Sequence, residues 1–131
     1  MPCEVSIMIT DDNDPVVRLW RQLWIDGDDS AVTDLLTDPY VRHTTDGRQI
    51  ESPTDYAQHV CTVTRHIKGT EVVVDHLNHA GDMTYVRFTL LGINLATGKP
   101  VSIGWLAHYR TENSQLAESW SMRQTDFVWG E

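Results

Sequence analysis

The last thirty residues alternate between two kinds of side chain almost without a break, and this constrains the fold more than any other feature. From position 101 to 110 the odd positions hold an apolar series of Val101, Ile103, Trp105, Ala107 and Tyr109. The even positions are mostly small or polar. Because successive side chains of a strand point to opposite faces, this period of two predicts a half-buried β-strand with its odd positions turned inward.

The alternation returns after a turn at positions 111–115. One set of positions holds Leu116, Glu118, Trp120, Met122, Gln124 and Asp126, and the other holds Ala117, Ser119, Ser121, Arg123 and Thr125. Since the first set carries the large apolar residues, we expect it to face inward on a second antiparallel strand. A polar group on a buried face needs a partner or a purpose. The inner face of these two strands is therefore where we predict a binding or catalytic pocket.

A helix is predicted ahead of the strands, at residues 14–27, with an Asp-Pro cap at its start and a glycine at its end. Trp20 and Trp24 lie one turn apart in this segment, so they should share one face. We expect this face to meet Trp105 and Trp120 on the concave side of the sheet.

The remaining elements complete a single domain that spans residues 1–131. They are expected to be helices at 30–36 and 52–67, a short hairpin at 40–50, and strands at 70–79 and 83–92, while residues 1–12 read as a tail or short strand. The helix at 52–67 begins with a second cap followed by proline, Ser52-Pro53. Helices followed by a strand meander are typical of an α+β protein. In such a protein a twisted, curved antiparallel sheet can wrap around the N-terminal helices as a cone and leave a pocket at its open end.

Composition excludes several classes of partner. The chain has 131 residues and a formal net charge of −9, which disfavours nucleic acid and anionic membranes as partners. The sequence has no apolar run long enough to span a bilayer and no signal-peptide pattern at its start. With only Cys3 and Cys61 present, we expect two reduced thiols in a cytoplasmic protein.

Four segments together resemble a known family. They are Tyr40-Val41-Arg42-His43, Gly81-Asp82, Thr97-Gly98-Lys99-Pro100-Val101 and Leu116-Ala117-Glu118-Ser119-Trp120. In this order, over residues 14–126, they resemble the SnoaL-like polyketide cyclases of the nuclear transport factor two-like superfamily. The resemblance implies a cone-shaped fold that is often a homodimer, in a superfamily of cyclases, isomerases, epoxide hydrolases, dehydratases and proteins without known catalysis. It also implies an acid/base aspartate four residues after Trp120, where this chain has Gln124.

Three residues are candidates for catalysis. Asp126 would share a face with Gln124 in a regular strand, and Glu118 lies on the same face. Burial among aromatic side chains would raise the pKa of either carboxyl group toward the range that suits a general acid or base. His43 matches a histidine of the family and would lie at the pocket rim as a hydrogen-bond donor or proton carrier. Each of the three could instead make only a structural hydrogen bond.

Six residues are predicted to contact a ligand, namely Trp20, Trp24, Trp105, Tyr109, Trp120 and Gln124. The tryptophans could form the wall of a cavity for a flat apolar ligand, or they could simply fill the core. His76, His79 and His108 do not follow a recognised zinc spacing. We therefore predict neither a metal nor a cofactor.

Two functions remain open at this point. The first is a small enzyme that uses cofactor-free acid/base chemistry on a hydrophobic molecule, by cyclisation, isomerisation, or hydration or hydrolysis. The second is a non-catalytic ligand-binding or dimerisation module of the same fold. The polar residues on the predicted inner face favour the first, and Gln124 favours the second. The predicted outer face of the last strand, with Ala117, Ser119, Ser121 and Arg123, indicates at most a wet interface.

Overall fold

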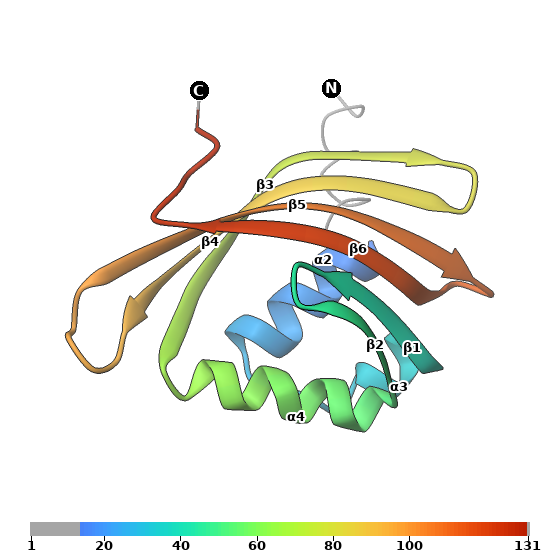
Figure 1. Ribbon diagram of the computed structural model, residues 1–131, viewed down its shortest axis with the longest axis horizontal. Helices are drawn as coiled ribbons and strands as arrows, with labels where there is room; N and C mark the ends of the chain where they lie inside the picture. The colour runs from blue at the N-terminus through green and yellow to red at the C-terminus, as the bar shows by residue number, and fades with distance from the viewer. Residues whose placement is uncertain (1–13, 131) are drawn as a thin grey trace, which may run out of the picture.

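The computed structural model describes residues 14–130, in which a six-stranded sheet curves around a layer of helices on its concave side (Figure 1). The helices are α2 (Pro15–Leu19), the π-helix η1 (Trp20–Ile25), α3 (Val32–Leu35) and α4 (Pro53–Thr64). The strands are β1 (Leu36–Thr44), β2 (Gly47–Glu51), β3 (Ile67–Ala80), β4 (Met83–Asn94), β5 (Pro100–Glu112) and β6 (Gln115–Thr125). The segment 1–12, expected to be a tail or a short strand, lies outside the described residues. None of the helices in the described range is long and apolar enough to cross a membrane.

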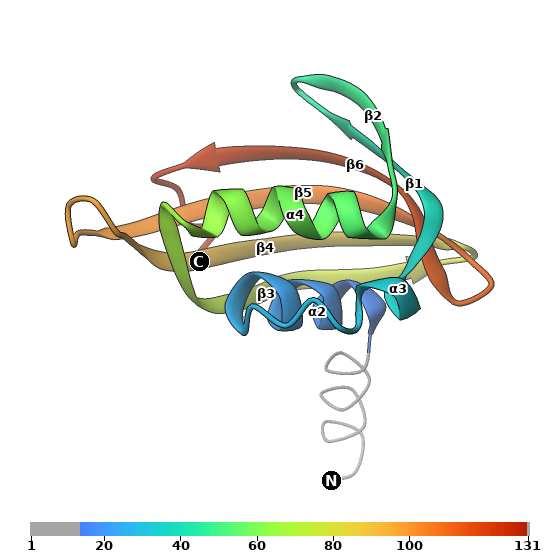
Figure 2. The same cartoon turned by 90° about the horizontal axis from the view of Figure 1, so that it is seen from below.

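The strands follow the order β2-β1-β6-β5-β4-β3 across the sheet. The predicted meander of β3 to β6 is antiparallel throughout. One pairing differs from the antiparallel expectation, because β1 lies parallel to β6. This parallel pair places the β1–β2 hairpin beside the last strand, near the N-terminal end of α4 (Figure 2). The predicted α+β class, with a curved sheet around N-terminal helices, is confirmed.

The helix starts agree with the predicted caps. Asp14 Oδ1 accepts a hydrogen bond of 2.9 Å from the Val16 N–H at the start of α2. Ser52 Oγ accepts one of 3.1 Å from the Asp55 N–H at the start of α4. Each of these bonds satisfies a backbone donor that has no partner within the helix itself. Helix α4 ends at Thr64, before the expected end at residue 67, because β3 already begins at Ile67.

The helical layer is joined to the sheet by an aromatic cluster. Trp20 stacks on Trp24, with ring centroids 4.7 Å apart. It also meets Trp105 and Phe88 edge-on, at 4.8 and 4.4 Å. Its indole Nε1 donates a hydrogen bond of 2.9 Å to the Tyr109 hydroxyl. The helical face predicted from the spacing of the tryptophans therefore packs against the inward positions of β4 and β5.

An irregularity at the start of β6 reverses the predicted faces of that strand. Leu116 and Ala117 are consecutive and both buried, and the pairing of β5 with β6 shifts register between Arg110 and Thr111. Because strand side chains alternate, one extra residue exchanges the two faces of everything that follows. The concave face then receives Ser119, Ser121, Arg123 and Thr125, and the convex face receives Glu118, Trp120, Met122 and Gln124. The inward placement expected for this second set is wrong.

The residues that follow β6 turn back over the convex face. Trp129 Nε1 donates a hydrogen bond of 3.1 Å to the Trp105 carbonyl oxygen. Phe127 lies so close to Gly104 that a Cβ added to this glycine would be 2.5 Å from the ring. Glycine at position 104 therefore permits the close approach of this segment to β5.

Asp14 is a suitable residue for testing how the helical layer is attached. Its Oδ1 caps α2, and its Oδ2 lies 2.7 Å from His79 Nε2 on β3. We expect Asp14→Ala to lower the free energy of unfolding by about 1 kcal/mol, measured by chemical denaturation, because the cap is lost. Asp14→Asn keeps an acceptor for the cap and should lose less. Equal losses in the two variants would show that the contact with His79 matters more than the cap.

Candidate functional site

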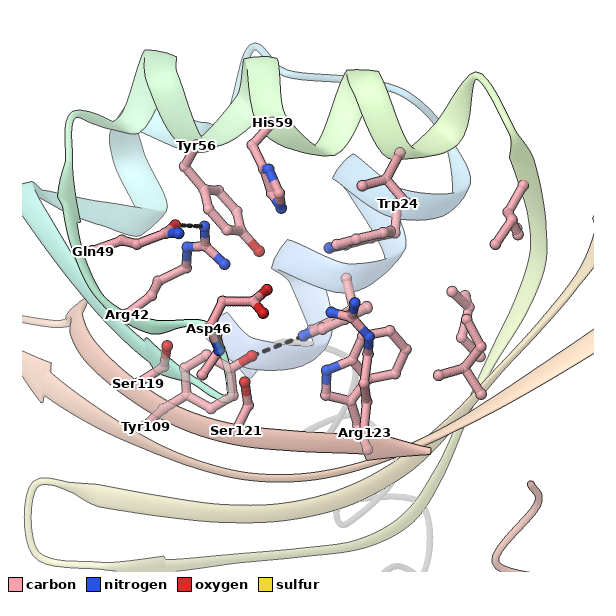
Figure 3. A pocket seen from close by; sticks show the side chains of 18 of the residues that line it. Trp24, Arg42, Asp46, Gln49, Tyr56, His59, Tyr109, Ser119, Ser121 and Arg123 are labelled. Carbon is pink, nitrogen blue, oxygen red and sulfur yellow. Dashed lines mark hydrogen bonds between the residues drawn. The ribbon is translucent and has the colours of Figure 1, made fainter. Parts of the chain in front are cut away.

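A cavity of about 230 Å³ lies between the concave face of the sheet and the helices η1 and α4 (Figure 3). One part of its wall is apolar and consists mainly of Trp20, Trp24, Val63, Ile67, Leu90, Ile103 and Trp105. The other part is polar and includes Tyr40, Arg42, Asp46, Gln49, Tyr56, His59, Tyr109, Ser119, Ser121 and Arg123. An apolar pocket with a few converging polar groups is typical of a small-molecule site.

Arg42 is a fixed cation in the polar wall. It lies on β1, where its Nε donates to Glu51 and its Nη2 donates to Gln49, both on β2. Its guanidinium also lies over the Tyr56 ring, 5.4 Å from the centroid. With partners on three sides, this side chain has little freedom to move, and it presents a positive charge to the cavity.

Asp46 brings a carboxylate to the same space from the turn between β1 and β2. Its side chain points toward the region between the hydroxyl groups of Tyr56 and Tyr109 (Figure 3). The turn is held locally, because the Asp46 N–H donates a hydrogen bond of 3.1 Å to Thr44 Oγ1. Asp46 is exposed at the mouth of the cavity, so both solvent and a bound molecule can reach its carboxylate.

His59 extends from α4 into the cavity, opposite the sheet (Figure 3). Partial burial is the main cause that lowers its pKa below the ordinary value of 6.5, and the positive charges of Arg42 and Arg123 lower it further against the opposing effect of Glu51. The imidazole is therefore neutral at pH 7 and can accept a proton.

Three buried tyrosines supply hydroxyl groups to the polar wall. Burial is the largest cause that raises the pKa of each of Tyr40, Tyr56 and Tyr109 above its usual value. The hydroxyl groups consequently keep their protons across the physiological range and can act as hydrogen-bond donors. Tyr109 accepts the Trp20 N–H, which leaves its own proton for another acceptor.

The predicted ligand-contact residues divide between the two faces of the sheet. Trp20, Trp24, Trp105 and Tyr109 line the cavity, as the spacing of the helix and of β5 predicts. Trp120 and Gln124 were expected beside them, but both lie on the convex face, because the register shift at the start of β6 reverses the alternation.

Glu118 and His43 meet on the convex face and do not line the cavity. His43 Nε2 lies 2.7 Å from Glu118 Oε2, and Arg110 Nε donates to Glu118 Oε1 at 3.2 Å. The His43 ring also stacks on Trp120, with centroids 5.1 Å apart. Hydrogen bonding to His43 is the largest cause that lowers the pKa of Glu118, with Arg110 acting in the same direction against burial. The raised pKa and inward position expected for Glu118, and the rim position expected for His43, are wrong.

Asp126 also lies outside the cavity. It follows the last residue of β6 and has a positive φ of 58°, so the strand geometry that would have turned it inward ends before it. Its N–H donates a hydrogen bond of 2.7 Å to the Ser102 carbonyl oxygen. The side chain is exposed, and the expected placement beside the aromatic residues is wrong.

Three polar residues of the cavity, Arg42, Asp46 and His59, were not predicted, although the sequence carries a local signal for two of them. Arg42 lies two residues after Tyr40, which is buried and points inward, so the period of two on β1 places both side chains on the same face. His59 lies three residues after Tyr56 on α4 and so shares its face. Asp46 had no such signal, because an Asp-Gly turn between strands is ordinary turn chemistry. No group of three or more potential metal ligands occurs among residues 14–130.

A family model of the SnoaL-like domain matches residues 16–119, which is most of the chain. The chain belongs to the SnoaL-like domain family. The resemblance predicted from the four sequence segments is thereby confirmed. No curated protein matches this SnoaL-like domain in sequence.

Several solved structures are similar to this SnoaL-like domain in fold. A candidate polyketide cyclase from Acidithiobacillus ferrooxidans has a TM-score of 0.76 at 15% identity, covering 84% of this chain and 85% of that one. IdmH from Streptomyces antibioticus, a candidate polyketide cyclase, has a TM-score of 0.71 at 17% identity, with 85% and 90% covered. An LEH-like epoxide hydrolase from M. tuberculosis has a TM-score of 0.70 at 14% identity, with 88% and 84% covered. At these identities the likeness concerns the fold.

The electrostatics of the cavity can be tested at His59. We expect His59 to titrate below 6.5, and we expect Arg42→Gln to raise its pKa, because the substitution removes a nearby positive charge and leaves Glu51 unpaired. Proton NMR titration of the six histidines would measure this, with the His59 signal assigned by its loss in His59→Gln. Arg48→Gln, on the exposed strand β2, is the control and should leave the His59 pKa unchanged. A His59 pKa at or above 6.5 in the parent protein would contradict the proposed environment.

Proposed function

We propose that this SnoaL-like domain is an enzyme that performs cofactor-free acid/base chemistry on a small hydrophobic molecule held in the cavity. One observation carries the proposal: an aromatic wall shares its space with a carboxylate, a neutral imidazole and several hydroxyl donors. Cyclisation, isomerisation and hydration or hydrolysis all need one group that removes a proton and another that returns it. Asp46 and His59 are the side chains that we assign to these roles.

The division of labour follows from the chemistry of each group. Asp46 removes a proton from a substrate carbon or from water, and the negative charge that develops collects on a substrate oxygen. The hydroxyl groups of Tyr56 and Tyr109 donate hydrogen bonds to that oxygen, which is most effective in a site with little water. Asp46, now protonated, then returns the proton at another position of the substrate, either directly or after passing it to the neutral imidazole of His59. This sequence describes an isomerisation, and the same groups serve a cyclisation or a hydration.

The fold neighbours support the class of reaction. They include candidate polyketide cyclases and an epoxide hydrolase. Because one fold can host several chemistries, the reaction is assigned from the cavity of this chain and not from its neighbours.

Proton removal by Asp46 can be measured without knowledge of the natural substrate. Exchange of the α-protons of small cyclic ketones for deuterium in D₂O, followed by NMR, reports the first step of the mechanism. We expect Asp46→Asn to reduce this exchange by roughly a hundredfold or more, because general-base catalysis is lost, while the ketone still binds. Asp82→Asn, in the exposed turn between β3 and β4, is the matched control and should retain exchange. Full exchange in Asp46→Asn would contradict the role of this carboxylate.

We also propose that the chain forms a homodimer through the convex face of its sheet. This second candidate function rests on the exposure of Leu106 (51%), Trp120 (37%) and Met122 (65%). Leu106 and Met122 are direct partners across β5 and β6, so the apolar surface is continuous. An exposed apolar patch of this kind favours association, and the same patch on a second copy would complement it. Ser119, Ser121 and Arg123, which the sequence alone placed on the outer face of β6, lie on its concave face instead.

A single charge at the centre of the convex face tests the dimer. Met122→Lys should shift the protein from dimer to monomer, measured by light scattering after size-exclusion chromatography, because two lysines would be buried facing each other. Thr62→Lys adds the same charge on the exposed side of α4 and should leave the dimer intact. A parent protein that is monomeric at high concentration would exclude this interface.

A further inference from the structure

The indole N–H of Trp24 has no hydrogen-bond partner among the described residues, although it is fully buried. Trp24 as a whole is only 8% exposed, and its nitrogen is turned into the cavity, toward the Tyr56 hydroxyl (Figure 3). Hydrogen bonding from Trp24 is one cause that lowers the pKa of Tyr56, but the geometry of the two groups does not meet that of a hydrogen bond, so Tyr56 does not satisfy this donor. A buried donor without an acceptor is costly and rare, so its retention in a cavity wall calls for an explanation.

Other tryptophans of the chain satisfy their N–H groups. Trp20 Nε1 donates to the Tyr109 hydroxyl, and Trp129 Nε1 donates to the Trp105 carbonyl oxygen. Trp24 cannot turn to find an acceptor of its own, because its ring is stacked on Trp20 with an angle of 12° between the planes. Packing thus holds one free donor at a fixed point of the cavity.

We propose that the Trp24 N–H is the subsite for a neutral carbonyl oxygen of the substrate, so that the substrate class is a small, flat ketone or ester. This inference rests on the proposed function, because it assumes that the substrate occupies the cavity. The stacked indoles of Trp20 and Trp24 provide an apolar environment for a flat ring. A neutral acceptor suits this part of the cavity better than an anion, because its walls are aromatic and Asp46 faces the same space.

The size of the cavity limits the substrate further. Its volume of about 230 Å³ lies below the range of roughly 300–1,000 Å³ that is typical of pockets for drug-sized ligands. A molecule with one or two rings therefore fits this site better than a four-ring polyketide. When Asp46 removes a proton from the carbon next to this carbonyl group, the negative charge develops on the same oxygen, so the Trp24 N–H joins the tyrosine hydroxyl groups as a donor to it.

A matched pair of ligands separates the carbonyl from the ring. 1-Indanone and indane share the same two-ring skeleton and differ in the carbonyl group. In ¹H–¹⁵N NMR spectra, 1-indanone should shift the indole N–H signal of Trp24, assigned by its absence in Trp24→Phe, and indane should leave it nearly unchanged. Trp24→Phe keeps an aromatic ring but removes the donor. It should bind 1-indanone several-fold more weakly than the parent does, at most roughly tenfold, and should bind indane equally well.

Trp129→Phe is the control, because it removes an indole N–H that lies outside the cavity, and it should bind both ligands as the parent does. Equal responses of the Trp24 signal to the two ligands, unchanged binding of 1-indanone by Trp24→Phe, or binding of neither ligand by the parent would each overturn the inference. If Trp24→Phe does not fold, as judged by thermal unfolding, the Trp24 signal is assigned by triple-resonance NMR of the labelled parent, and the comparison of the two ligands on the parent decides alone. Binding of 1-indanone through Trp24 without α-proton exchange would uphold the carbonyl subsite and reject the proposed catalysis.

Discussion

The contacts of Trp20 set the distance between the helical layer and the sheet, and the cavity depends on that distance. Its ring stacks on Trp24 within η1, meets Phe88 and Trp105 on two neighbouring strands, and donates its N–H to Tyr109. A side chain held in this many directions cannot move to let the sheet settle onto the helices. The space beside it stays open, with an apolar wall that is rigid because it is part of the core.

Part of the polar wall depends on the irregularity at the start of β6. The register shift at the start of β6 turns two serines and Arg123 toward the cavity and turns Trp120 and Met122 toward the convex face. The same shift therefore adds polar groups to the wall of the site and creates the apolar surface that we propose for dimerisation. A regular strand would have turned Trp120 and Met122 toward the cavity and the serines and Arg123 outward, and the convex face would then lack the apolar surface that we propose for dimerisation.

Within the site, the groups that hold a molecule are buried and the groups that move protons are exposed. Hydroxyl and indole donors come from buried positions on the sheet, α4 and η1, where packing holds them in place. Asp46 and His59 come from a turn and from the exposed side of the cavity mouth, where protons can exchange with solvent. This arrangement combines fixed hydrogen-bond geometry with accessible acid/base groups, which is what cofactor-free proton transfer requires.

The amino-acid sequence by itself determined the α+β class, the helix caps at Asp14 and Ser52, the strand meander and the aromatic wall, because each follows from local periodicity or from a bond between near neighbours. Only the tertiary structure decided which face of β6 lines the cavity, since the shift depends on how that strand pairs with β5. It also decided that Arg42, Asp46 and His59 meet the polar residues of β6, because the parallel pairing of β1 with β6 joins distant parts of the chain. Such pairings bring together residues that are far apart in sequence, and local patterns carry no information about which partner a strand will choose.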